Sequence, residues 1–184
     1  MLLVLLTAVI LPFVVCDPDS SKVCLPDKIQ FNTYSIETDV NAVVAIDYTR
    51  KLLGTRSTNN SVVDDLATGK SYVTDASGSC QQYLLPLDKL YPQCLPAGAS
   101  FGGDIYIGFG PNRVPAEAWE SPYNGGILRM AFSNQPGQPR YPILAKFIDG
   151  KGDRFTTFYF NPNETISAAN IFDIPDPCPP ATFG

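Results

Sequence analysis

The chain has 184 residues, of which 18 are acidic and 13 are basic, and it contains no histidine. A net charge of −5 without any basic run repels phosphate backbones, which argues against nucleic-acid binding. The lack of histidine removes the usual general base and the usual zinc ligand, so most enzyme mechanisms are disfavoured. We therefore expect a non-enzymatic protein without a cofactor, calcium aside.

The chain begins with an uncharged apolar block, Leu2–Val15. This block is too short to span a bilayer and is typical of a secretory signal peptide. Val14 and Cys16 are small enough for the two positions that a signal peptidase reads, so we predict that residues 1–16 are removed. Residues 17–184 then form a single secreted domain without a transmembrane segment. A buried N-terminal strand and a lipid-modified Cys16 are the alternatives.

Cleavage after residue 16 leaves an even number of cysteines, as an oxidising compartment favours. They are Cys24, Cys80, Cys94 and Cys178. Four cysteines permit three pairings, and the sequence alone does not choose among them. Two Asn-x-Ser/Thr sequons fall at polar strand ends or turns, so we predict N-linked glycans at Asn59 and Asn163.

Short strands are indicated by the 14 glycines and 17 prolines, whose clusters separate segments rich in β-branched and aromatic residues. In the first half we predict strands over 28–36 and 41–48 and a turn into another strand over 50–56. The polar stretch 57–69 is expected to be a loop, with a helical turn over 62–66 as an option.

The second half begins with a cysteine- and proline-rich stretch, 79–120, that contains a short strand over 104–108. Further strands are predicted over the segments 126–133, 141–148, 154–160 and 165–174. Asp149–Asp153 connects two of them as a hairpin, because its glycines supply positive φ angles. No segment of ten or more residues has helical periodicity, so we expect an all-β antiparallel sheet with little helix.

Two of these strands carry apolar residues on both faces. One face can pack a core while the other covers a second layer or lines a cavity, and the pattern is equally consistent with both interpretations. If there is a cavity, the candidate lining residues are Phe147, Phe158 and Phe160.

Three short motifs resemble known sites but lack essential residues. Ala67–Ser71 ends like a phosphate-binding loop, yet Asp64 stands where that loop needs glycine, so we predict a turn. Asp149–Asp153 resembles the start of a calcium loop, but Lys151 occupies a ligand position. An EF-hand is therefore excluded, although an irregular oxygen-ligand site is not. Asp75–Ser79 resembles an aspartic-protease turn, but that chemistry needs a second copy.

Several loose motifs follow one another over nearly the whole predicted mature chain. They are Cys24-Leu25-Pro26, Asp47-Tyr48 with Arg50 and Arg56, Cys80 before a Leu/Pro-rich segment, Ala97–Gly108, Val114–Trp119, Arg140–Ile143, Asn163–Ile174 and Asp176–Pro180. In their order and spacing the chain resembles the ependymin-related secreted glycoproteins of invertebrate type. The resemblance implies two stacked, curved antiparallel sheets, as a β-sandwich or half-open barrel, around an apolar pocket, similar to bacterial lipoprotein carriers.

The resemblance also implies cross-links and partners. Members are extracellular or lysosomal, glycosylated and often homodimeric, and they are linked to calcium, lipid-like ligands and extracellular matrix. Their common bridge corresponds to Cys80–Cys178, which leaves Cys24–Cys94 as the second pair. Mammalian-type members carry a cysteine where this chain has Arg140, so Cys24 lacks its usual partner here.

The leading hypothesis is a secreted, non-enzymatic glycoprotein that holds a hydrophobic or lipid-like molecule between its β layers. The alternative is a structural component of extracellular or mineralised shell matrix. In that case the acidic surface and the glycans would hold calcium weakly and diffusely.

Overall fold

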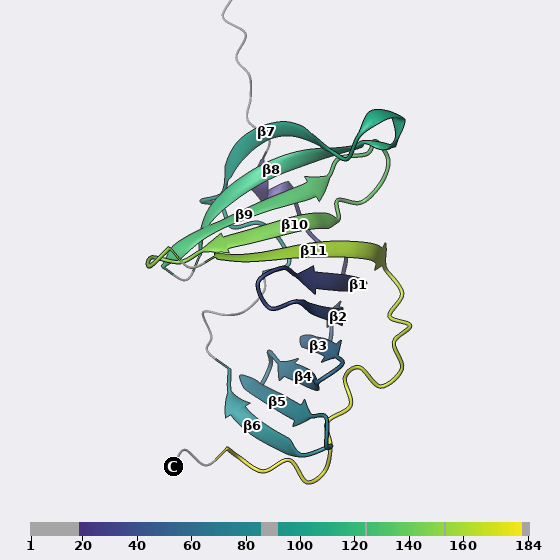
Figure 1. The fold of residues 1–184 in the computed structure, drawn as a ribbon, viewed down its shortest axis with the longest axis vertical. Helices are drawn as coiled ribbons and strands as arrows, with labels where there is room; N and C mark the ends of the chain where they lie inside the picture. The colour runs from purple at the N-terminus through teal and green to yellow at the C-terminus, as the bar shows by residue number, and fades with distance from the viewer. Residues whose placement is uncertain (1–18, 86–91, 124, 153, 182–184) are drawn as a thin grey trace, which may run out of the picture.

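One antiparallel sheet of eleven strands organises the protein, as the computed structural model shows (Figure 1). The structure describes residues 19–85, 92–123, 125–152 and 154–181, so the predicted signal peptide lies outside the described residues. The strands are β1 (Lys28–Ser35), β2 (Val40–Asp47), β3 (Leu52–Ser57), β4 (Asn60–Asp65), β5 (Lys70–Asp75), β6 (Cys80–Leu84), β7 (Ser100–Ile107), β8 (Val114–Tyr123), β9 (Gly126–Ser133), β10 (Pro142–Ile148) and β11 (Arg154–Asn163). Their order in the sheet is β6-β5-β4-β3-β2-β1-β11-β10-β9-β8-β7.

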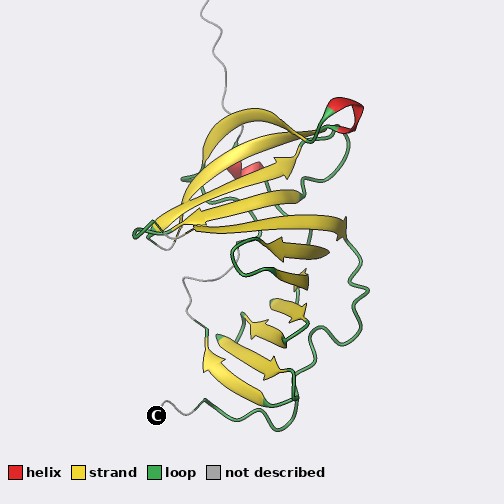
Figure 2. Ribbon diagram, viewed as in Figure 1, coloured by secondary structure: helices red, strands yellow, loops and turns green. Residues whose placement is uncertain are grey.

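The predicted all-β antiparallel class is confirmed. Within the described ranges the helical elements are short 3₁₀ turns, Ser20–Lys22 and Gly110–Asn112 (Figure 2). The strands form one curved, open sheet, which corresponds to the half-open alternative. Two separate stacked sheets do not form, because β1 pairs with β2 on one side and with β11 on the other.

Some of the strand predictions are confirmed and others are wrong. The strands predicted over 28–36, 41–48, 126–133, 141–148 and 154–160 are confirmed, as is the hairpin that joins Ile148 to Arg154. Strand β4 lies in the predicted loop 57–69, and β5, β6 and β8 were not predicted. The predicted strand 165–174 is wrong, since this segment is irregular and lies against the sheet.

A C-terminal segment, residues 165–181, runs along the first half of the sheet (Figure 1). Its backbone is held by side chains rather than by a strand ladder. The Gln30 side chain accepts bonds from the Ser167 and Ala168 amides, and Arg56 donates to the carbonyls of Ala169 and Asn170. These contacts give hydrogen-bond partners to backbone groups of a segment that has no strand ladder.

The C-terminal segment approaches the sheet closely at Gly54 of β3. A Cβ atom at this position would lie 2.5 Å from the carbonyl oxygen of Ile171, so the contact requires glycine. Further on, Cys178 is bonded to Cys80, and the Gln82 amide donates to the Pro179 carbonyl. The segment therefore also covers the edge of β6.

A second irregular layer lies on the opposite, inner face of the sheet. We call residues 19–27 and 92–96 the N-terminal cover. A disulfide between Cys24 and Cys94 joins its two segments. Val23 and Leu95 pack in one core cluster with Trp119 and Phe132. The two disulfides are thus the pairs that the resemblance implies, and each fastens one irregular layer.

Candidate ligand-binding cavity

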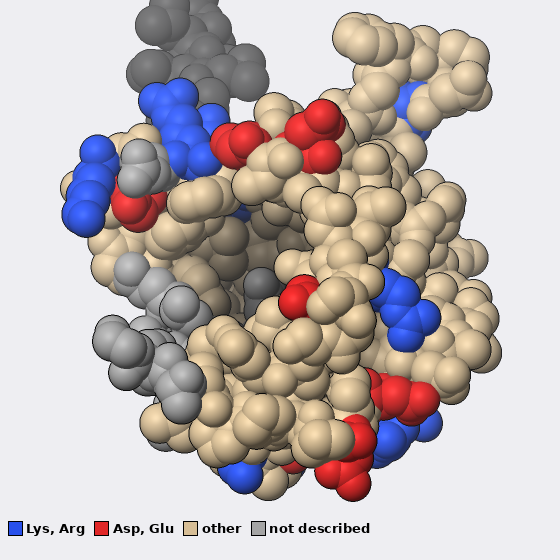
Figure 3. Space-filling model, turned by 60° about the horizontal axis from the view of Figure 1, so that its bottom comes forward, with Lys and Arg blue, Asp and Glu red and all other residues tan. Residues whose placement is uncertain are grey.

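A cavity of about 470 Å³ lies on the inner face of the sheet, and Figure 3 shows the hollow with charged groups around it. Its walls come from β1–β3 and β8–β11, and the N-terminal cover closes part of it. The lining is mostly apolar, and examples are Val44, Ile46, Leu53, Leu128 and Met130. This volume and character are typical of a small-molecule site.

Strand alternation decides which predicted residues reach the cavity. Phe147 lines it, and its register partner on β11 is Phe155. Because successive side chains of a strand point to opposite faces, Phe155, Thr157 and Tyr159 face the cavity. The prediction that Phe158 and Phe160 line it was therefore wrong.

Phe158 and Phe160 lie on the outer face instead. Their rings stack on each other with centroids 6.3 Å apart, and Phe160 is 44% exposed. Phe158 pairs in register with Tyr34 of β1 and Leu144 of β10. The two phenylalanines thus belong to an apolar strip on the side that the cavity does not reach.

Aromatic rings form much of the cavity wall. The ring of Phe147 packs edge to face on Tyr123, with ring centroids 6.0 Å apart, and stacks on Phe155, with centroids 6.4 Å apart. Phe31 and Tyr159 meet edge to face at 5.0 Å. Phe155 stays 48% exposed although it lines the cavity, so we place it near the opening. Such rings supply a large apolar contact area in defined geometry.

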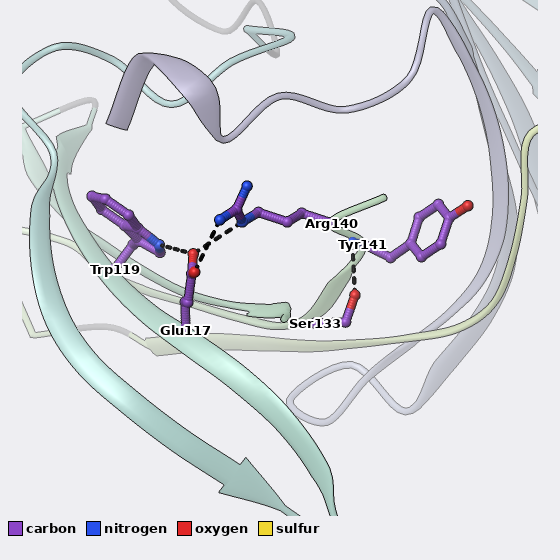
Figure 4. A network of polar contacts seen from close by, with 5 residues as sticks. All are labelled: Glu117, Trp119, Ser133, Arg140 and Tyr141. Atoms are coloured by element: carbon purple, nitrogen blue, oxygen red, sulfur yellow. Dashed lines mark hydrogen bonds and ion pairs between the residues drawn. The ribbon is translucent and has the colours of Figure 1, made fainter. Parts of the chain in front are cut away.

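A buried ion pair fixes the cavity's tryptophan. Glu117 is 4% exposed, and both of its oxygens accept bonds of 3.1 Å from Arg140 (Figure 4). The indole nitrogen of Trp119 also donates to Glu117, at 3.3 Å. Nearby, the Tyr141 amide donates to the Ser133 hydroxyl at 2.9 Å. The residue at the missing-cysteine position, Arg140, is therefore the partner of a buried carboxylate, a role that sequence analysis did not anticipate.

Asp47 is a buried carboxylate at a turn. It accepts bonds from the Thr49 hydroxyl at 2.6 Å and the Arg50 amide at 3.0 Å, and Lys28 lies 3.5 Å away. Burial alone raises the pKa of Asp47, but these hydrogen bonds and the lysine charge outweigh it, so the pKa is lowered. The charged Asp47 carboxylate thus stabilises the turn that follows β2.

Asp64 has the opposite electrostatic environment. Burial raises its pKa, and a hydrogen bond with Ser71 opposes the rise only in part. Its Oδ1 atom is buried and has no hydrogen-bond partner. Asp64 lies opposite Leu53 in the β3–β4 register, and directly paired residues share a face, so it lies on the inner face beside the cavity lining.

Other predicted sites lie at the surface. Asn59 is exposed at the tip of the β3–β4 hairpin, and Asn163 is exposed at the end of β11. The described ranges contain no group of three or more His, Cys, Asp or Glu residues that could hold a metal ion. In the same ranges, no helix is long and apolar enough to cross a membrane.

Together, the fold and the cavity define a class: an open, curved all-β protein with an apolar hollow on its inner face. An uncharacterized conserved protein from Thermus thermophilus has a similar structure, with a TM-score of 0.60 and 11% sequence identity. The alignment covers 85% of this chain and 91% of that chain, and at such identity it shows the fold alone. No family model and no curated protein matches the chain, so the resemblance to ependymin-related proteins stays a prediction.

Proposed function

We propose that the protein is a secreted, non-enzymatic glycoprotein that binds a hydrophobic or lipid-like molecule in the inner-face cavity. The observation that carries the proposal is the cavity of about 470 Å³ with its mostly apolar lining. Protein interiors are normally close-packed with few voids larger than water, so a hollow of this size is not explained by core packing. It is a suitable volume for a ligand.

Three observations support the extracellular part of the proposal. Two disulfides are typical of an oxidising compartment, and no membrane-spanning helix is found in the described ranges. Asn59 and Asn163 are both exposed, as glycan attachment requires.

Two neighbouring threonines of β11 provide a matched test. Thr157 lines the cavity, whereas Thr156 precedes it on the strand and points to the other face. Thr157→Trp should fill the hollow and lower the affinity for a neutral fluorescent lipid probe at least about tenfold, which is about 1.4 kcal/mol. Thr156→Trp should leave the affinity unchanged.

The measurement is a probe titration on the purified mature chain, together with mass spectrometry of co-purified lipids. Equal affinity in the two tryptophan variants would remove the cavity as the site. If the wild-type protein retains no lipid and does not bind the probe, the proposed function is wrong.

A matrix component remains the second proposal, and it rests on the net charge of −5 and the exposed sequons. It predicts self-association that requires calcium and that reverses with a chelator, as sedimentation measurements would show. A carrier predicts no such dependence.

A further inference from the structure

Charge is nearly absent from the cavity lining. Among the described lining residues there is no lysine or arginine, and the charged residue is Glu120. Its carboxylate is already paired, because Oε2 accepts a 2.7 Å bond from Arg129. The remaining polar groups are uncharged hydroxyls and an amide, from Thr33, Tyr48, Thr55, Gln93, Ser121, Tyr123, Thr157 and Tyr159.

Three basic residues of the lining strands and of the loop before β10 do not line the cavity and are bonded to other groups. Arg140 bonds to both oxygens of Glu117, and Lys28 pairs with Asp47. The Arg56 guanidinium donates hydrogen bonds to carbonyls of the C-terminal segment. Each of these cations would have to leave a buried or bonded partner to meet a ligand anion. An anionic head group enclosed by this lining would therefore lack a counter-charge there, and burying an unpaired anion is strongly unfavourable.

Asp64 adds a negative group on the same face. It lies opposite the lining residue Leu53, and its buried Oδ1 has no partner. This oxygen would repel a second carboxylate or a phosphate.

We infer that the cavity takes amphiphiles whose head group is uncharged and carries hydrogen-bond donors, such as fatty alcohols or monoglycerides, and discriminates against fatty-acid anions and phosphate heads. The inference rests on the proposed function, since it names the class of molecule that the same cavity binds.

Two ligands with the same acyl chain separate head group from tail. Monopalmitoyl glycerol and palmitate are each competed against a neutral fluorescent probe on the mature wild-type protein, at pH 8, where palmitate is ionised. We expect the monoglyceride to bind at least about tenfold more tightly. Equal or tighter binding of palmitate would overturn the inference and leave the proposed function standing. Binding of neither ligand nor probe would overturn both.

A cation placed in the lining should reverse the discrimination. Thr157→Lys gives palmitate a counter-charge inside the cavity, so its affinity should rise at least about tenfold. Thr156→Lys adds the same charge on the outer face and should leave palmitate affinity unchanged. Thr55→Lys supplies a cation from β3 and serves as the second variant if Thr157→Lys does not fold. Unchanged palmitate affinity in the folded lining variants would contradict the inference.

Discussion

The two halves of the sheet are covered by irregular segments on opposite faces. In β1–β6 the outer face is partly covered, since Ile171 of the C-terminal segment lies against Gly54, whose register partners Ala45 and Val63 are buried. In β7–β11 the inner face is covered, because the N-terminal cover packs on Trp119 and its neighbours. The outer face of the second half keeps exposed apolar side chains, including Phe160.

This difference explains how an open sheet can hold a cavity. A sheet must bury one face against another layer, and here both layers are irregular segments fastened by a disulfide. The C-terminal segment lies outside, and the inner face of β1–β3 lines the cavity and contacts Leu25 of the N-terminal cover. The N-terminal cover closes part of the inner face but does not fill it. The outer face and the cavity on the inner face are therefore bordered by different irregular segments.

Removing the Cys80–Cys178 disulfide, which holds the C-terminal segment on the outer face, should have the largest effect on stability. Cys80 and Cys178 are 98 residues apart, and the chain-entropy model assigns about 4–5 kcal/mol to such a cross-link. We expect the double variant Cys80→Ala, Cys178→Ala to lose about that much free energy of unfolding in urea titrations. Hydrogen exchange should show the C-terminal segment detached from β3 and β4.

Cys24→Ala, Cys94→Ala is the matched variant, with a separation of 70 residues and a similar expected loss of stability. The two variants should differ in binding, when both are compared under conditions where they remain folded. Loss of the Cys24–Cys94 bridge loosens the cavity's cover and should lower probe affinity, whereas loss of the Cys80–Cys178 bridge should not. Lower probe affinity on loss of the Cys80–Cys178 bridge, and not on loss of Cys24–Cys94, would show that the N-terminal cover is not the segment that controls binding.

The second half contains a buried ion pair, and an exposed pair lies beside it for comparison. Arg140→Ala leaves Glu117 buried and without its guanidinium partner, which should cost about 3–5 kcal/mol. Arg129→Ala breaks the exposed pair with Glu120, where both side chains are about half exposed, and should cost less than about 1 kcal/mol. Urea unfolding of both variants measures the difference. Similar losses would mean that Glu117 is solvated once Arg140 is removed.

The regular strands were predictable because they are short runs of β-branched and aromatic residues between turn residues. The strands labelled β1, β2, β9, β10 and β11 each contain such a run. Strand β4 was missed because its sequence, NSVVDD, is mostly polar. Its Val63 is buried and pairs in register with Gly54, which Ile171 of the C-terminal segment covers, and local sequence does not reveal such a contact.

The sequence did not show which side chains of a strand face the cavity. The sequence indicated that β11 is apolar on both sides, but it did not say which side faces the hollow. The register with β10 decides this, because Phe147 pairs with Phe155 and so places Phe158 and Phe160 outside. The pairing of Glu117 with Arg140 likewise depends on tertiary contact across 23 residues. A hint was available, since Glu117 alternates with Trp119 on a strand that must bury its tryptophan.

The smallest expected effect comes from two adjacent aspartates of β4, which should respond to pH with opposite sign. Burial raises the pKa of Asp64, so its folded state holds a proton more tightly and its contribution to stability falls as pH rises above about 3.8. At Asp65, burial is outweighed by hydrogen bonds from Thr68 and Ala67, and the pKa is lowered. Its contribution is present above about 3.8 and is lost on acidification.

At pH 7, therefore, Asp64→Asn should raise the melting temperature, because it removes a half-buried charge and keeps an acceptor for Ser71. We expect less than about 1 kcal/mol, which is at most about 3 °C for a chain of this size. Asp65→Asn should lower the melting temperature at the same pH. Thermal unfolding from pH 7 down to pH 3 should show both differences shrinking, since Asp64 becomes neutral and the unfolded state binds a proton at Asp65 before the folded state does. A stabilising effect of Asp64→Asn that persists at pH 3 would show that packing, and not charge, makes this position unfavourable for aspartate.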